Sequence, residues 1–254
     1  MSHARPPDNR PAGRLLASPN FGERRFRRRP DCLILHYTGM PTGESALKLL
    51  LDPASQVSAH YFVWEDGRVD QLVDESDRAW HAGVGSWKGE TDLNSASIGI
   101  EIVNAGHDGG CPPFPDRQIA ATIDLAQDIC SRWNIAPERV LAHSDVAPAR
   151  KRDPGEAFPW ETLWRAGVGH WIEPATLAGG PLFCHEEEGP PVRALQAMLA
   201  LYGYGVDLTG VYNRQTRLVL AAFQRHFRAQ RVDGEADEST VATLKALIER
   251  LERA

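Results

Sequence analysis

The 254-residue sequence lacks several features that would mark a membrane protein, a disulfide-stabilised protein or a nucleic-acid-binding protein. No apolar run approaches the roughly 18 residues needed to span a bilayer. None of the four cysteines lies in a C-x-x-C pair, so we do not expect a cysteine-type zinc site, and nothing demands an oxidising compartment. The formal net charge of −6 does not favour a general nucleic-acid role.

The N-terminal segment does not have the pattern expected of an export signal. Residues 1–20 are polar and proline-rich and contain no apolar core of the kind a secretory signal needs. The basic run RRFRRR at residues 24–29 could indicate a twin-arginine signal or a nucleic-acid patch. The apolar run after it, CLIL, is too short for export and leads straight to His36. We therefore interpret the basic run as a solvated lead-in to a strand.

The first two thirds of the chain alternate between strand-like and helical patterns. Strand-like runs occupy residues 31–40, 58–73, 95–106 and 138–148. Helical spacing occupies residues 44–53 and 116–134. Asp66-Gly67 is a hairpin signal inside the second run, and Asp116 stands where a helix cap is expected. The alternation predicts an α/β fold in which helices flank a mixed β-sheet.

The last third has a different organisation. Residues 166–191 are rich in Gly and Pro without a sustained period and predict a linker. Three helical patterns follow, with a weak repeat between VDLTGVYNRQT and VDGEADEST. In each copy a Thr falls six residues after a Gly, and Asn213 or Asp237 lies three residues before that Thr, at a cap position. We predict a small three-helix module that folds separately from the rest.

Candidate metal ligands follow the ends of predicted strands. His36 and His143 each end an apolar run, and Asp153 lies ten residues after His143. Two imidazoles and one carboxylate leave a tetrahedral zinc ion one open position, which is the pattern of a catalytic site. The alternative is that each His is simply hydrogen-bonded at the end of its strand.

Two further charged residues have open interpretations. Glu101 lies between Ile100 and Ile102, where strand alternation could turn it to solvent or into a cleft as a general base. Lys151 could be a surface charge, or it could point inward and stabilise a developing oxyanion.

Six motifs occur in the order LHYTG, SAHYFV, AWHAG, SIGIEIVNAG, AHSDVAPARKRDPG and FPW. Together they resemble the zinc-dependent N-acetylmuramoyl-L-alanine amidases of type 2, which share a fold with peptidoglycan recognition proteins. The resemblance covers roughly residues 20–175. The tail, over roughly residues 186–252, is similar to the small peptidoglycan-binding module of many cell-wall hydrolases. Both resemblances point to the same polymer.

The resemblance implies a role for each candidate. His36, His143 and Asp153 correspond to the three zinc ligands, Glu101 to the catalytic acid/base and Lys151 to the catalytic lysine. The implied reaction is hydrolysis of the amide between N-acetylmuramic acid and L-alanine, in peptidoglycan or in (anhydro)muropeptides. A non-catalytic peptidoglycan-recognition protein is the alternative, although such proteins typically lack the third ligand.

Other residues are candidates for substrate binding. His60, Trp80 and His81 could line the cleft, or they could have packing and supporting roles. Asn104 could bind the stem peptide or simply end its strand. Asp145 is interpreted as a partner that stabilises its loop.

The expected organisation is an N-terminal extension (1–19), a zinc amidase domain (20–175), a linker (176–188) and a three-helix peptidoglycan-binding domain (189–254). We expect a monomer that binds peptidoglycan or muropeptide, with no nucleic-acid partner and no membrane-spanning segment. A DNA-binding tail would need a basic helix, whereas the last helical pattern is mixed in charge. The missing signal favours the cytoplasm, and a wall-binding tail favours the periplasm as the alternative.

Overall fold

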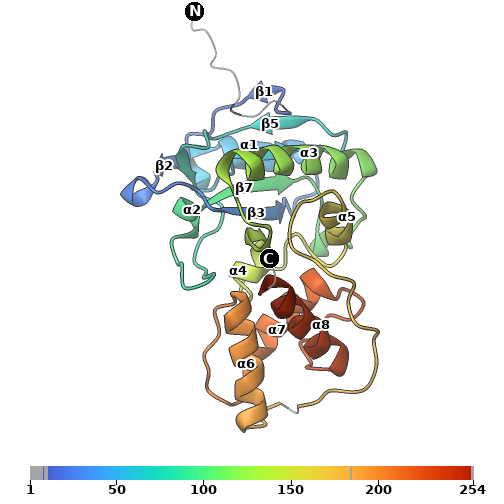
Figure 1. Cartoon of the computed structure of the whole chain (residues 1–254). Coiled ribbons are helices and arrows are strands. Elements are labelled where there is room, and N and C mark those ends of the chain that lie inside the picture. The colour runs from blue at the N-terminus through green and yellow to red at the C-terminus, as the bar shows by residue number, and fades with distance from the viewer. Residues whose placement is uncertain (1–7, 9–10, 184, 253–254) are drawn as a thin grey trace, which may run out of the picture.

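The computed structural model describes residues 8, 11–183 and 185–252. A mixed β-sheet forms the centre of the upper part of the molecule in Figure 1. The strands are β1 (Arg14–Leu15), β3 (Cys32–Tyr37), β4 (Tyr61–Val63), β5 (Val69–Gln71), β7 (Ser97–Ile102) and β8 (Val140–Ala142). Their order is β1-β5-β4-β7-β3-β8. In the described sheet, strands β4, β7, β3 and β8 are parallel, the β1–β5 pair is also parallel, and the β4–β5 pair is antiparallel. The predicted mixed sheet is confirmed.

Helices cover both faces of this sheet. Helix α3 (Asp116–Trp133) packs on the main core, and α1 (Gly43–Leu51) packs on a second, smaller core. In β4, Tyr61 and Val63 belong to the main core and Phe62 belongs to the α1 core. This division follows from the alternation of side chains along a strand. It also identifies the α1 face, on which the candidate site is built.

The remaining elements are short. They are β2 (Phe21–Glu23), β6 (Asp77–Ala79), α2 (Leu93–Ala96), α4 (His143–Val146), α5 (Trp160–Arg165) and 3₁₀ turns at Arg25–Arg27, Pro53–Ser55, His107–Gly109 and Pro137–Arg139. Strands β2 and β6 pair with each other in an antiparallel ribbon. The cap of α3 is Pro115, and Asp116 is instead the first helical residue, where its charge suits the positive end of the helix dipole.

The basic run at residues 24–29 is only partly solvated. Arg24 is buried, and its guanidinium donates to the backbone oxygens of Glu75, Ser95 and Ser97 at 2.8–3.0 Å. Burial lowers the pKa of Arg24 to about 10. The expectation of a solvated run is therefore wrong at this residue, because backbone carbonyl groups replace its water.

Three helices form the lower part of the molecule: α6 (Pro190–Tyr202), α7 (Arg214–Phe227) and α8 (Glu238–Leu251). The predicted caps are confirmed, since Asn213 accepts from the backbone N–H of Thr216 at 3.0 Å and Asp237 accepts from that of Thr240 at 2.7 Å. These contacts stabilise the start of α7 and α8.

The sequence repeat of the tail has a structural basis in two equivalent glutamines. Gln196 accepts from the N–H of Gly210 at 2.8 Å and donates to Thr216 Oγ1 at 3.0 Å. Gln224 makes the same two contacts in the second copy, with Gly234 and Thr240. Each copy is thus a turn closed against the preceding helix by a buried amide.

The tail is packed against the amidase part. One continuous hydrophobic core runs from the sheet through Trp87 and Val146 into Leu199 and Phe223 of the tail helices. The predicted linker also follows the tail closely, since the N–H of Leu182 donates to Ala236 O at 2.7 Å. The two parts are therefore docked against each other, and separate folding of the tail stays a prediction. Across the described part of the chain, no helix is both long and apolar enough to cross a membrane.

Candidate metal centre and active site

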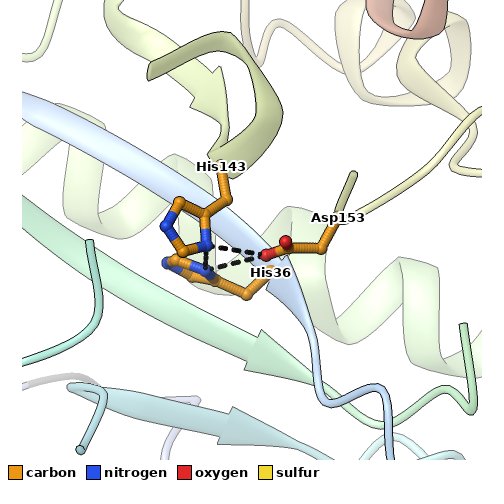
Figure 2. A group of neighbouring side chains, drawn as sticks. All are labelled: His36, His143 and Asp153. Atoms are coloured by element: carbon orange, nitrogen blue, oxygen red, sulfur yellow. Dashed lines mark hydrogen bonds and ion pairs between the residues drawn. The ribbon is translucent and has the colours of Figure 1, made fainter. Parts of the chain in front are cut away.

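Three side chains converge at the carboxyl edge of the sheet, as Figure 2 shows. His36 Nδ1 lies 2.9 Å from His143 Nδ1 and 3.1 Å from Asp153 Oδ2, and His143 Nδ1 lies 2.9 Å from the same oxygen. All three side chains are buried. The structure therefore brings together the three residues that the sequence predicts as metal ligands.

The topology explains this convergence. Strands β3 and β8 are parallel neighbours with Leu35 opposite Ala142, so the residues that follow, His36 and His143, reach the same edge. The chain then turns through α4 and returns with Asp153, whose backbone oxygen accepts from the N–H of Ser144 at 3.0 Å. This bond joins the two ends of the turn that carries both ligands.

The proton positions on His36 follow from its partners. Ser97 donates its hydroxyl proton to Leu93 O at 2.5 Å, so Ser97 Oγ is left as the acceptor for His81 Nε2 at 3.3 Å. His81 Nδ1 then has a free lone pair and accepts from His36 Nε2, which lies 3.0 Å away. The Nδ1 atom of His36 is therefore unprotonated and faces the site.

His143 is fixed in the same tautomer by a shorter route. Its Nε2 donates to the backbone oxygen of Ala82 at 2.9 Å, which leaves the Nδ1 lone pair facing His36 and Asp153. Ligands about 2.0–2.1 Å from a tetrahedral zinc ion lie about 3.3 Å from one another. Two inward lone pairs and a carboxylate oxygen at nearly this spacing fit a shared metal ion, and the outer hydrogen bonds are those that orient metal-bound imidazoles.

The charge states of these groups suit a cation as well. Burial, together with the neighbouring His143, lowers the pKa of His36 to about 4, so the imidazole stays neutral near pH 7. Burial alone would raise the pKa of Asp153, but attraction to His143 and His36 outweighs it and holds that pKa well below the usual range. At these two residues the site offers a neutral nitrogen donor and an ionised oxygen donor, which is the state that metal binding requires.

Glu101 faces this cluster. It lies opposite both His36 and Phe62 in the register of the sheet, so its side chain belongs to the α1 face together with theirs. Its Oε2 atom is buried and has no hydrogen-bond partner among the described residues. Burial, reinforced by the nearby Asp153, raises the pKa of Glu101 well above its ordinary value. Of the two interpretations of this residue, the structure supports the cleft and not a solvent-facing position.

A cavity of about 370 Å³ opens beside the cluster. Lys151, Trp80 and His81 line it together with Glu101, His143 and Asp153. Trp80 is half-buried and Lys151 is partly exposed, so both can reach a bound molecule. His81 borders the cavity too, but its ring nitrogens are used by His36 and Ser97.

Two of the expected cleft residues lie elsewhere. His60 is fully buried; its Nδ1 accepts from the N–H of Gly99 at 2.9 Å and its Nε2 lies 3.1 Å from Asp77 O. Asn104 donates to Pro112 O at 2.9 Å and accepts from the N–H of Gly106 at 2.8 Å. Neither residue borders the described cavity. Their side chains join backbone segments, and a role for either residue in substrate binding stays a prediction.

Gly99 is a site residue that sequence reasoning missed. A Cβ atom at this position would lie 2.5 Å from His81 Cγ and Nδ1, so the absence of a side chain makes room for the ring that orients His36. The only sequence signal was its spacing, two residues before Glu101 and on the same face of the strand.

Comparison with known proteins agrees with this geometry. Residues 26–156 match the family model described as N-acetylmuramoyl-L-alanine amidase. Residues 188–244 match a family model of a peptidoglycan binding domain.

Two curated relatives have similar sequences. N-acetylmuramoyl-L-alanine amidase AmiD of Escherichia coli K12 is 42% identical over 86% of this chain and 82% of its own length. 1,6-Anhydro-N-acetylmuramyl-L-alanine amidase AmpD of Haemophilus influenzae is 32% identical over 58% of this chain and 88% of its own length.

Solved structures extend the likeness to the fold. The complex of Escherichia coli AmiD with anhydro-N-acetylmuramic acid-L-Ala-D-gamma-Glu-L-Lys has a TM-score of 0.75 at 40% identity, covering 89% of this chain and 91% of that one. AmpDh3 of Pseudomonas aeruginosa has a TM-score of 0.75 at 33% identity, covering 89% and 93%. The chain therefore belongs to the N-acetylmuramoyl-L-alanine amidase family.

Proposed function

We propose that this N-acetylmuramoyl-L-alanine amidase holds a zinc ion with His36, His143 and Asp153. The observation that carries the proposal is the meeting of two unprotonated Nδ1 atoms and one carboxylate oxygen within 3.1 Å of one another. Zinc suits this set because magnesium and calcium prefer oxygen ligands, whereas imidazole suits zinc. Bound zinc would supply Lewis acidity and make water a nucleophile at neutral pH.

The surrounding side chains then have defined tasks. Glu101 takes a proton from the attacking water and returns it to the leaving amine of L-alanine, because its buried carboxyl has a raised pKa and a free oxygen. Lys151, on the wall of the same cavity, stabilises the negative charge that develops on the scissile carbonyl oxygen. Trp80 offers a half-buried ring against which the substrate packs.

The substrate we propose is a peptidoglycan-derived muropeptide, cut between the lactyl group of N-acetylmuramic acid and L-alanine. A relative with 40% identity has been solved with an anhydro-N-acetylmuramic acid peptide bound. AmpDh3 has also been solved in complex with an anhydromuramic pentapeptide. A non-catalytic recognition protein would not account for a complete ligand set beside a buried, unsatisfied carboxylate.

The tail is proposed to bind the same polymer, in line with its match to a peptidoglycan binding domain. The boundaries at residues 19, 175 and 188 and the monomeric state stay part of this proposal. Sedimentation of the full chain tests the oligomeric state. Fractionation of the native protein between periplasm and cytoplasm tests the expected cytoplasmic location against the periplasmic alternative.

Metal analysis of the purified chain tests the central proposal. We expect one zinc ion per chain, loss of anhydro-muropeptide hydrolysis on dialysis against a strong chelator, and recovery when zinc is restored. Magnesium should not restore the activity, because two of the three donors are nitrogens. Full activity in a chain shown to contain no zinc would refute the proposal.

A further inference from the structure

The turn that carries two of the proposed ligands is held from behind by the tail. Asp145, two residues after His143, is fully buried. Its Oδ2 accepts from the N–H of Ala142 at 2.8 Å and from His226 Nδ1 at 2.7 Å, and its Oδ1 accepts from the hydroxyl of Tyr204 at 2.7 Å. Tyr204 and His226 belong to the tail, so Asp145 is bonded at once to the ligand turn and to the three-helix module.

A second contact holds the other arm of the same turn. Glu156, three residues after Asp153, forms an ion pair with Arg225 at 3.3 Å. The same Glu156 oxygen accepts from His107 Nε2 at 3.0 Å, and His107 Nδ1 accepts from the hydroxyl of Tyr37 at 2.9 Å. Arg225 and His226 are neighbours on α7, so one point on this helix reaches both arms of the ligand turn.

Packing prevents the tail from sliding on this surface. His226 stacks on Trp160 of the amidase part with ring centroids 3.7 Å apart. The N–H of Lys88 donates to Gly203 O at 2.8 Å, and a Cβ atom at Gly203 would lie 2.6 Å from the ring of the buried Trp87. The contact is close-packed and directional, so a displacement of α7 would be transmitted to α4.

We infer that α7 of the tail is a positioning element of the metal centre, acting through His226 on Asp145 and through Arg225 on Glu156. The inference depends on the proposed metal function. Neither Asp145 nor His226 borders the described cavity, so their effect reaches the chemistry through the orientation of His143 and Asp153. Ligands held in place before the ion arrives bind it more tightly, because less ordering remains to be done.

Substitutions at His226 in the full-length chain separate positioning from packing. His226→Phe keeps a ring against Trp160 and removes the donor to Asp145, and His226→Asn keeps a donor near the position of Nδ1 and removes the ring. Zinc affinity is measured by competition with a chromophoric chelator, and thermal unfolding is recorded on the metal-free protein. We expect His226→Phe to weaken zinc binding about 10-fold or more. We expect His226→Asn to stay within about threefold of wild type even where its unfolding temperature falls.

Arg225 supplies a second, independent variant with a matched control. Arg225→Gln removes the ion pair to Glu156, and Arg217→Gln on the same helix removes an ion pair to Glu235 inside the tail. Only the first should weaken zinc binding. Asp145→Asn, which is nearly isosteric, should weaken it as well and serves if His226→Phe does not fold.

The outcomes distinguish this inference from the proposal on which it depends. A wild-type chain that binds no zinc overturns both. A wild-type chain that binds zinc, with His226→Phe, Arg225→Gln and Asp145→Asn all binding it within twofold of wild type, overturns the inference alone. Lower unfolding temperatures with unchanged zinc affinity would then leave the tail contacts with a purely structural role.

Discussion

Replacing Gly99 by alanine should damage the metal centre although the change adds a single methyl group and touches no ligand. The new Cβ would lie 2.5 Å from His81 Cγ and Nδ1, whereas ordinary carbon contacts are about 3.5–4.0 Å. The imidazole of His81 must therefore move by about 1 Å. Its hydrogen bond to His36 Nε2, now 3.0 Å, would lengthen to about 4 Å and be lost.

Two measurable effects follow from this displacement. Overpacking of a buried site of this kind costs about 1–3 kcal/mol of the free energy of unfolding. Loss of the group that orients a metal-bound imidazole typically weakens metal binding about 10–100-fold. We therefore expect Gly99→Ala to fold, to bind zinc at least about 10-fold more weakly in a chelator competition, and to lose hydrolysis at limiting zinc.

Control variants make the reasoning refutable. Gly22→Ala adds a methyl group to another strand, where the nearest heavy atom is Trp80 Nε1 at 4.0 Å, and should change neither quantity appreciably. In the Gly99→Ala/His81→Ala double variant the clash is gone, so its zinc affinity should match that of His81→Ala alone. A folded Gly99→Ala chain with wild-type zinc affinity would show that His81 does not orient His36.

Substitutions at Glu101, Asp153 and His170 test three other parts of the molecule. Glu101→Gln should keep zinc and fold but lose turnover about 10²–10⁴-fold, whereas Glu23→Gln on an exposed strand should not; a near wild-type rate would remove Glu101 from the mechanism. Asp153→Ala should lose zinc affinity and activity together, and retention of tightly bound zinc by metal analysis would mean that another carboxylate is the ligand. Burial lowers the pKa of His170 from 6.5 to about 4 in the folded chain. Between pH 6.5 and 4 the unfolded chain therefore binds more protons than the folded chain, so the free energy of unfolding should fall as the pH drops through this range. His170→Asn should reduce that slope in urea titrations, and an unchanged slope would contradict the assignment.

Local patterns were sufficient to predict the sheet, and the three proposed ligands were predicted from their positions after strand-like runs together with the family resemblance. The apolar run before His36 and the one before His143 form neighbouring strands, and parallel strands deliver the residues that follow them to one edge. The caps at Asn213 and Asp237 were equally local, since each depends on a Thr only three residues away.

The supporting residues could not be predicted, because their roles depend on contacts between segments far apart in the chain. His81 looked like a cleft residue from its motif, yet its ring nitrogens bond to Ser97 and His36. His60 is as polar as a ligand but is buried against Gly99. Spacing along one strand cannot say which ring from another segment will occupy the space above a glycine.

The same limit applies to the docking of the tail. Gly and Pro content indicates where regular structure stops, but it does not indicate whether the chain beyond is free or docked. Here docking combines a shared hydrophobic core with the bonds of a buried carboxylate, Asp145, that the sequence presented only as a loop partner. A flexible tether would raise the local concentration of the enzyme on a polymer and leave its chemistry unchanged. A helix bonded to the ligand turn could have a second effect. Polymer bound by the tail would shift α7, and α7 contacts both arms of that turn. Binding and hydrolysis would then be coupled through Arg225 and His226, so substitutions at these two residues should alter the response of hydrolysis to insoluble polymer more than substitutions elsewhere in the tail.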